Sequence, residues 1–549
     1  MLSTRRNPIV FKAWFALAGT SLLVTACNPD WPCQFAPSSA NCVSATGQPL
    51  DGGPADSGTV RSGGLDAGDA DSGSDAGSEI KGSSDAGADS GTPDSGTLDS
   101  GTLDSGTAQS GTGDAGAAPS SYSAYTGTDY KAIPAAPNLG AANYSFNDPV
   151  FGSRILRVTD QNTHAGQSFI STDAGFHRTF NADSTAIKLT GPDGWAYWLE
   201  FNPAAFSVGD GSSTPAIHTV PFAATWEWSA VDPDVIYYLK NSQIAAYNKS
   251  TGATTSLGGP SNGDAATYDA VVIGADRWVC SAAGAGVQDT YAEFYCVEPA
   301  HPSNFKFVNI TAHTINGVVQ ADPGWPVPAA GETLGIHDIS SSTGSSWLEL
   351  TLHQQSWGAN GGAVFNIDTG TWSLLTNADN YWSGHVFLGN GKYVNAAGSK
   401  GGADSRGMVM RDAAQLMDSS QYLFIAQPPA PSNGWCDADH SSWFNSLSNP
   451  NAPVLQSRYN VVAPSQCAFA WTGEITAGAV DGSNTVWRFA HNHNGGQSCY
   501  YAQSFAQISN DGKWALFSSP WDGALGAGTG SAGNFGCSSR IDTFVVELK

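Results

Sequence analysis

Five histidines stand beside short apolar runs in a chain of 549 residues that holds only eleven histidines. They are His177, His337, His385, His440 and His491. Each lies just before, within or at the end of a segment with the alternation of a β-strand, and they come from different parts of the chain. Neutral imidazoles that converge from several strands suit a divalent metal such as Zn, Mn, Fe or Ni. The pattern predicts a metal or ligand site, and the alternative is that each histidine only hydrogen-bonds a neighbouring layer of structure.

The elements that would carry these histidines are short β-strands. From about Tyr122 onward, apolar runs of about four to eight residues alternate with turns rich in Gly, Asn, Asp and Ser. The best helical candidate is the short stretch Asp412–Met417. The region is therefore expected to be all-β, and its size fits a sandwich assembly, a β-helix or a propeller.

Internal repetition favours the propeller among these architectures. One unit runs Phe180–Leu189, then a Gly-Pro-Asp-Gly turn, then Ala196–Phe201. Another runs Ile508–Phe517 and returns with Asp542–Leu548. Both units have the pattern strand, Asx-rich turn, strand, and an Asp-Gly pair tolerates the positive φ of a tight hairpin. The pattern resembles the hairpins of TolB-type propellers.

About seven such units can be counted, which predicts a roughly seven-bladed β-propeller over residues 122–549, with six or eight blades as alternatives. The C-terminal strand Phe544–Leu548 is expected to pair with the early strand Arg154–Val158. Such a pairing closes the ring and removes the exposed sheet edges.

The N-terminus has the pattern of a bacterial export signal. Three basic residues precede an apolar run over residues 13–26, which is short for a membrane span of about 20 residues. The run ends Val-Thr-Ala-Cys at residues 24–27 and resembles the lipobox of bacterial lipoproteins. The resemblance implies cleavage after residue 26, acylation of Cys27 and attachment to a membrane through the lipid, with Asn28 favouring the outer membrane or cell surface. The alternative is an ordinary cleaved signal with a chance cysteine.

Eight cysteines remain besides Cys27, an even number that suits an oxidising compartment. They fall into near-neighbour pairs: Cys33 and Cys42, Cys280 and Cys296, Cys436 and Cys467, Cys499 and Cys537. Sequence alone does not fix which cysteines bond to each other, so these four disulfides are candidates.

A spacer separates the short cysteine-containing segment 27–50 from the predicted propeller. Residues 51–121 consist mainly of Asp, Ser, Gly, Thr and Ala, and a five-residue unit repeats over residues 93–107. Thirteen acidic and two basic residues between positions 51 and 114 give a net charge of −11. Such a segment buries too little to offset its ordering entropy, so we expect a disordered tether of about 40–50 Å. A calcium-binding repeat is the alternative.

The net charge and the absence of certain motifs make several classes of partner and enzyme less favoured. The chain has a net charge of −25, of which −16 follows residue 114, and this argues against nucleic acid and anionic membrane surfaces as partners. The sequence contains no HExxH, Walker or EF-hand motif. Eighteen tryptophans permit sugar stacking, although packing between blades is the favoured interpretation.

Histidines that precede propeller strands, as at His177, His337, His385 and His440, resemble the axial histidines of oligogalacturonate lyases. The resemblance implies a divalent metal that neutralises a uronate carboxylate, after which a base removes the adjacent proton and the linked sugar leaves by β-elimination. It also makes Arg178 and Arg488 candidates to hold substrate carboxylates.

Two functions are therefore expected from the sequence. The first is a surface-anchored lipoprotein whose propeller binds a glycan or protein ligand on its loop-rich axial face. The second is a metal-dependent carbohydrate-active enzyme, above all a polysaccharide lyase.

Overall fold

The fold is taken from a computed structural model, which describes most of the chain after residue 115. The described residues are 116–164, 167–172, 177–192, 195–220, 226–259, 266–283, 291–321, 324–327, 334–353, 361–375, 386–396, 407–417, 423–427, 437–460, 470–495, 499–528, 535 and 537–549. The predicted signal peptide, Cys27, the segment 27–50 and nearly all of the predicted tether lie outside these residues.

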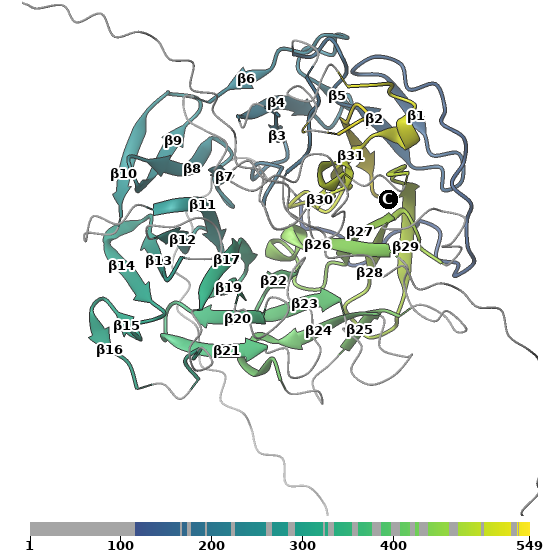
Figure 1. The fold of residues 1–549 in the computed structure, drawn as a ribbon. Helices are drawn as coiled ribbons and strands as arrows, with labels where there is room; N and C mark the ends of the chain where they lie inside the picture. Colours follow the sequence, from purple (N-terminus) through teal and green to yellow (C-terminus); the bar gives the residue numbers. More distant parts are fainter. Residues whose placement is uncertain are drawn as a thin grey trace, which may run out of the picture. The chain divides into compact units, whose positions relative to one another are not determined.

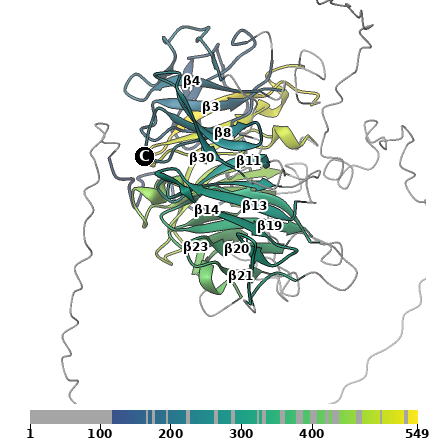
Figure 2. The ribbon, with the colours of Figure 1, turned by 90° about the vertical axis from the view of Figure 1, so that its left-hand side faces the viewer.

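The described residues form seven β-sheets arranged around a central axis as the blades of a propeller (Figure 1). The prediction of an all-β, seven-bladed propeller is thus confirmed. In most blades the strand that comes first in the sheet order lies nearest the axis and the last lies at the rim (Figure 1). Seen from the side, the sheets of neighbouring blades stack face to face (Figure 2).

The first four blades follow each other along the chain. Blade one holds β3 (Ala186–Thr190), β4 (Ala196–Asn202), β5 (Ser207–Val208) and β6 (His218–Thr219), and blade two holds β7 (Trp226–Trp228), β8 (Val235–Lys240), β9 (Gln243–Asn248) and β10 (Thr254–Gly258). Blade three holds β11 (Ala266–Ile273), β12 (Trp278–Ala283), β13 (Glu293–Glu298), β14 (His301–Asn309), β15 (Thr314–Ile315) and β16 (Val318–Val319). Blade four holds β17 (Gly335–Ser340), β19 (Trp347–His353), β20 (Gly361–Asn366) and β21 (Thr371–Leu375).

Of the last three blades, blades five and seven include strands from earlier parts of the chain. Blade five holds β18 (Ser342–Thr343), β22 (Phe387–Gly389), β23 (Lys392–Ala396), β24 (Met408–Asp412) and β25 (Leu423–Ala426), and blade six holds β26 (Asp437–Ser442), β27 (Val454–Asn460), β28 (Glu474–Gly478) and β29 (Val486–His491). Blade seven holds β30 (Gln507–Ile508), β31 (Trp514–Ser519), β32 (Asp542–Glu547), β2 (Arg154–Arg157) and β1 (Ser145–Asn147). The described 3-10 helices are η3 (Ala413–Gln415), η5 (Phe444–Leu447), η7 (Tyr500–Ala502) and η8 (Trp521–Gly523).

The two ends of the described chain close the ring in blade seven. Strand β2 pairs antiparallel with the C-terminal strand β32, with Ile155 opposite Val546 and Leu156 opposite Val545. These four side chains are buried, because both faces of this blade pack against neighbouring layers. The predicted pairing of Arg154–Val158 with Phe544–Leu548 is confirmed, and it satisfies edges that would otherwise be open.

The two predicted hairpin units are also present. Strands β3 and β4 pair in register from Ala186 opposite Glu200 to Thr190 opposite Ala196, and Phe180 adds a bridge to Ile187 on the axial side. The helical candidate Asp412–Met417 contains only the single turn η3, which is capped by the Asp412 side chain accepting from the Ala414 N–H at 2.9 Å. Among the described residues, no helix has the length and apolar character needed to cross a membrane.

The N-terminal segment, residues 116–131, is fastened to the body of the propeller at several points. The N–H of Ala118 donates to Oγ of Ser448 at 3.1 Å, and Nδ2 of Asn449 donates to the Ala118 carbonyl at 2.8 Å. Farther along, Tyr125 forms a bridge with Arg488 on the rim strand β29. The segment therefore runs from the residues that follow η5 to the rim of blade six.

Candidate functional site

Glu227 lies at the centre of a buried polar cluster on the propeller axis. It is the middle residue of β7, the innermost strand of blade two, and it is fully buried. Its carboxylate accepts hydrogen bonds from the Arg178 N–H at 2.6 Å and from Oγ of Ser341 at 3.0 Å, and its Oε2 lies 3.1 Å from Nδ1 of His177. One carboxylate thus joins blades one and two to the link between β17 and β18.

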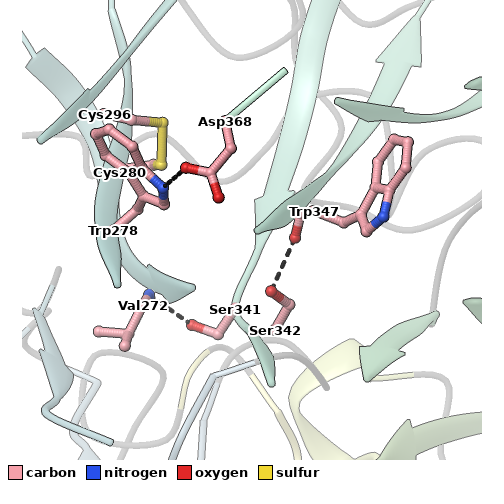
Figure 3. The surroundings of a disulfide bond; sticks show 8 residues. All are labelled: Val272, Trp278, Cys280, Cys296, Ser341, Ser342, Trp347 and Asp368. Carbon is pink, nitrogen blue, oxygen red and sulfur yellow. Dashed lines mark hydrogen bonds between the residues drawn. A yellow bond between two sulfur atoms is a disulfide. The ribbon is translucent and has the colours of Figure 1, made fainter. Parts of the chain in front are cut away.

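Ser341 connects this cluster to the packing of blades three and four. Its Oγ also accepts the Val272 N–H of β11 at 3.1 Å (Figure 3). The same figure shows Trp278 of blade three donating from Nε1 to Asp368 of blade four at 3.1 Å. The carboxylate of Glu227 is therefore held by Ser341, and Ser341 is itself positioned by the contact between blades three and four.

Arg178 brings a guanidinium to the same axis. Its side chain is 1% exposed and stacks on Phe444 of η5, with Cζ 4.4 Å from the ring centroid. Nη1 donates to Oδ1 of Asn510, in the turn between β30 and β31 of blade seven. The Nε and Nη2 atoms are buried and have no hydrogen-bond partner among the described residues.

The electrostatics of this guanidinium are unusual for an arginine. Burial lowers the pKa of Arg178 to about 10, and the nearby carboxylates of Glu227 and Asp276 act in the opposite direction. Asp276 itself accepts hydrogen bonds from Ser229, Ala230 and Tyr237, yet burial raises its pKa above the usual range. The axis therefore holds one cation with unused donors beside two acidic groups.

Such an arrangement is suited to holding an oxygen atom of a ligand. A buried donor left unpaired costs about 1–3 kcal/mol, and the cost is larger for charged groups. A carboxylate, hydroxyl or carbonyl oxygen placed between Nε and Nη2 would remove that cost, and guanidinium binds carboxylates in a bidentate fork. The residues that build this site come from blades one, two, six and seven, with Ser341 from the link between blades four and five.

The predicted site residues are only partly brought together. His177 and Arg178 both belong to the axial cluster. His440 lies on β26 and is buried, but its Nε2 lies 2.8 Å from Oε1 of Gln503 and its ring packs 4.5 Å from Phe505. His440 thus contacts the chain that leads into blade seven, which matches the alternative interpretation of hydrogen bonding to a neighbouring layer.

His491 and Arg488 lie on β29, the rim strand of blade six, and not on the axis. Arg488 donates to Glu474 at 2.6 and 2.7 Å and to the carbonyls of Gly127 and Asp129 at 2.7 and 2.9 Å. His491 is fully buried, and its N–H donates to Oδ2 of Asp148 at 2.9 Å. Both side chains hold elements of the propeller together, and the substrate role expected for Arg488 stays a prediction.

Two further histidine candidates are not described in atomic detail. His337 lies within strand β17, but its side chain is outside the described part of the structure, and His385 lies outside it altogether. Within the described residues, no three His, Cys, Asp or Glu side chains gather closely enough to hold a metal ion. Of the predicted histidines whose side chains are described, His177 is the one that lies beside a carboxylate of the axial cluster, that of Glu227.

Two of the four predicted disulfides are confirmed. Cys280 bonds to Cys296 between β12 and β13 in the core of blade three (Figure 3). Cys499 bonds to Cys537, which joins the segment after β29 to the segment before β32. Cys33, Cys42, Cys436 and Cys467 lie outside the described residues.

Sequence reasoning missed Glu227, Ser341, Phe444 and Asn510. Glu227 carried a signal, because a single acidic residue between Trp226 and Trp228 in an apolar strand must find partners when it is buried. Asn510 and Phe444 carried none, since a turn amide and an apolar residue after a strand are common in any β protein.

Comparison with known proteins gives structural likenesses only. No protein-family model and no curated protein matches the chain. A structure of oligogalacturonate lyase in complex with manganese is similar at a TM-score of 0.46 and 13% identity, covering 77% of this chain and 98% of that one. An oligogalacturonate lyase from Vibrio parahaemolyticus is similar at a TM-score of 0.46 and 11% identity, covering 74% and 96% of the two chains.

Proposed function

We propose that this chain is an exported, lipid-anchored surface protein whose propeller binds a glycan or protein ligand at its axis. The observation that supports the ligand site is Arg178, a buried guanidinium with Nε and Nη2 unpaired. Natural proteins pair nearly all buried polar groups, so a cation at the axis that has two nitrogen atoms without a partner among the described residues is a candidate to bind an oxygen atom of a ligand.

The ligand is expected to offer single acceptor oxygens and not a dense array of negative charge. Glu227 and Asp276 both lie close enough to act on Arg178, and the region after residue 114 carries a net charge of −16. A polyanion would be repelled by these groups, whereas a sugar hydroxyl, a peptide carbonyl or one carboxylate can reach the guanidinium.

The proposed anchor fits the way in which the chain enters the propeller. The lipobox-like residues 24–27 and the acidic repeats precede the N-terminal segment, which is hydrogen-bonded to Ser448, Asn449 and Arg488. Force on a tether attached to this segment would pass through these hydrogen bonds to the closed ring of blades. Labelling of cells with a radioactive fatty acid, compared between wild type and Cys27→Ala, tests the anchor.

The ligand site is tested by Arg178→Met, which replaces the guanidinium by an apolar side chain. Binding of the purified protein to an array of bacterial and plant glycans, and to extracts of surface proteins, is compared between wild type and variant. The proposal predicts a ligand that wild type binds and that the correctly folded variant has lost. Ligand binding that is equal in the two proteins would refute an axial role for Arg178.

A metal-dependent polysaccharide lyase is the second candidate. The observation that favours it is the pairing of His177 with Glu227, because a carboxylate that fixes the ring of a histidine is typical of metal ligands and of general bases. Metal content measured by plasma mass spectrometry in wild type and in a His337→Ala, His385→Ala double variant tests this candidate. Stoichiometric metal that the variant loses, together with unsaturated products from uronate polymers, would favour the lyase over the binding protein.

A further inference from the structure

We infer that a second binding site, for one unit of a neutral sugar, lies at the edge of blade seven. A pocket of 490 Å³ opens there between residues 137–141, residues 157–162 and residues 524–525. This volume lies within the range of about 300–1,000 Å³ that is usual for small-molecule sites. No residue of the pocket belongs to the axial cluster, so this inference is independent of the proposed axial function.

The lining of the pocket combines apolar side chains with two buried charged groups. Leu139 and Leu525 are the largest apolar side chains of its lining, and Leu139 is buried. Arg157 and Asp160 also line it, and they are only 9% and 3% exposed. Buried charges on a pocket wall next to apolar side chains are the pattern expected where a few polar groups orient a ligand.

Arg157 has hydrogen-bonding capacity left for such a ligand. Its Nε donates to the Thr159 carbonyl and to Asp542, its Nη1 donates to the Gly140 carbonyl, and its Nη2 donates to Asp542. A guanidinium has five N–H groups, so one N–H on each terminal nitrogen has no partner in these contacts. These bonds fix the plane of the guanidinium and leave the fork between Nη1 and Nη2 available.

Asp160 is the matching acceptor. Its Oδ1 accepts the Asn162 N–H at 2.7 Å and the Thr163 hydroxyl at 3.4 Å, and its Oδ2 accepts the Ala142 N–H at 3.0 Å, which hold the carboxylate in place three residues after β2. A carboxylate has about four acceptor positions and three are used here, so Oδ2 can accept one further hydrogen bond. A rigid donor and a rigid acceptor therefore line one pocket.

The charge of the pocket favours a neutral ligand over an anion. Behind the wall, the fully buried Asp542 is paired with both Arg157 and Arg540. With Asp160, the two arginines and two aspartates carry no net charge. An anion would find the guanidinium already neutralised and would face the carboxylate of Asp160.

A sugar meets these requirements better than other neutral ligands. Neighbouring hydroxyls can accept from Arg157 and donate to Asp160, and the apolar face of the ring can rest on Leu139 and Leu525. At the mouth of the pocket, Gln161 and Asn162 are exposed, and their side-chain amides can donate to and accept from the remaining hydroxyls.

The test uses the purified full chain and a panel of neutral oligosaccharides, namely gluco-, manno-, xylo- and galacto-oligosaccharides, with oligogalacturonate as the charged comparison. Calorimetry and saturation-transfer NMR measure binding. The inference predicts that at least one neutral sugar binds. Leu525→Trp, which fills the pocket and removes no polar group, should weaken that binding at least about tenfold, or about 1.4 kcal/mol.

The controls separate a local effect from unfolding. Gln161→Ala with Asn162→Ala alters only exposed side chains and should weaken binding about tenfold as well. Val319→Trp, at a residue of β16 that is 74% exposed, should leave it unchanged. The inference is overturned if no neutral sugar binds at millimolar concentration, if only oligogalacturonate binds, or if both pocket variants bind as wild type does.

Discussion

The carboxylate of Glu474 lies 2.6 Å from Nη2 of Arg488, and neither side chain is exposed to solvent. Burial raises the pKa of Glu474, and the hydrogen bond and charge of Arg488 oppose that effect. The same guanidinium also satisfies two carbonyls of the N-terminal segment. Every guanidinium nitrogen of Arg488 thus has a partner, whereas Arg178 on the axis has two nitrogen atoms without one among the described residues.

This contrast predicts unequal losses of stability for the same substitution at the two positions. Arg488→Met leaves the Glu474 carboxylate buried without its partner and should lower the free energy of unfolding by about 3–5 kcal/mol. Arg178→Met removes a cation whose unpaired donors cost free energy, which offsets the loss of its hydrogen bond to Asn510 and of its attraction to Glu227 and Asp276, so its stability loss should be smaller than that of Arg488→Met. Urea unfolding followed by tryptophan fluorescence measures both. Equal losses in the two variants would mean that Arg178 is a structural residue.

Acid should destabilise the fold in part through Asp148. Burial opposes ionisation of this residue, but hydrogen bonds and charge from His491 and the Phe151 N–H outweigh it and lower the pKa of Asp148. A carboxyl whose pKa is lower in the folded state than its unfolded value of about 3.9 stabilises the fold above that pH, and the contribution is lost as the pH falls through the folded pKa.

The corresponding measurement is the free energy of unfolding of wild type and Asp148→Asn at pH 6 and pH 3. The variant should be less stable by about 1–3 kcal/mol at pH 6, and the difference should shrink toward pH 3. Asp481→Asn is the control, because Asp481 is bonded to Ser483 on the surface and water screens its charge. A difference for Asp148→Asn that stays constant with pH would contradict the linkage.

The two described disulfides should stabilise the propeller to different extents. Cys280–Cys296 and Cys499–Cys537 close loops with sequence separations of 16 and 38 residues. In the chain-entropy account these correspond to about 3 and about 4 kcal/mol of stabilisation. Unfolding of the Cys→Ala double variants, with mass spectrometry to verify that the other bond is intact, checks the order. A larger loss on removing Cys280–Cys296 would show that core packing in blade three outweighs chain entropy.

Gly512 should be required both for its turn and for the N-terminal segment. It has a φ of +68°, and a Cβ added to it would lie 3.0 Å from the Cβ of Ala118. Gly512→Ala should cost about 1–2 kcal/mol for the left-handed conformation and more for displacing the segment. Gly391→Ala is the matched control, because Gly391 has a φ of +72° and open space around it.

Limited proteolysis separates the two effects at Gly512. Cleavage within residues 116–131 should become faster in Gly512→Ala and should stay as slow as in wild type in Gly391→Ala. Equal protection in both variants would mean that the segment does not rest on this turn.

Local features of the fold followed from the sequence because they depend on neighbouring residues. The turn between Ile508 and Trp514, the alternation of β3 and β4, and the near-neighbour pairing of Cys280 with Cys296 are all encoded within a few tens of residues. The closing pair β2 and β32 was also predictable, because a repeat of blades leaves one unpaired strand at each end.

The position of a strand within its blade was decided only by the tertiary structure. Alternation with a period of two tells which residues share a face, but it does not distinguish an axial strand from a rim strand. For this reason His177 and His491 carry the same local signal, yet one lies beside Glu227 on the axis and the other beside Asp148 at the rim. Arg178 and Arg488 differ in the same way, since only the closed ring determines how many partners a buried guanidinium meets.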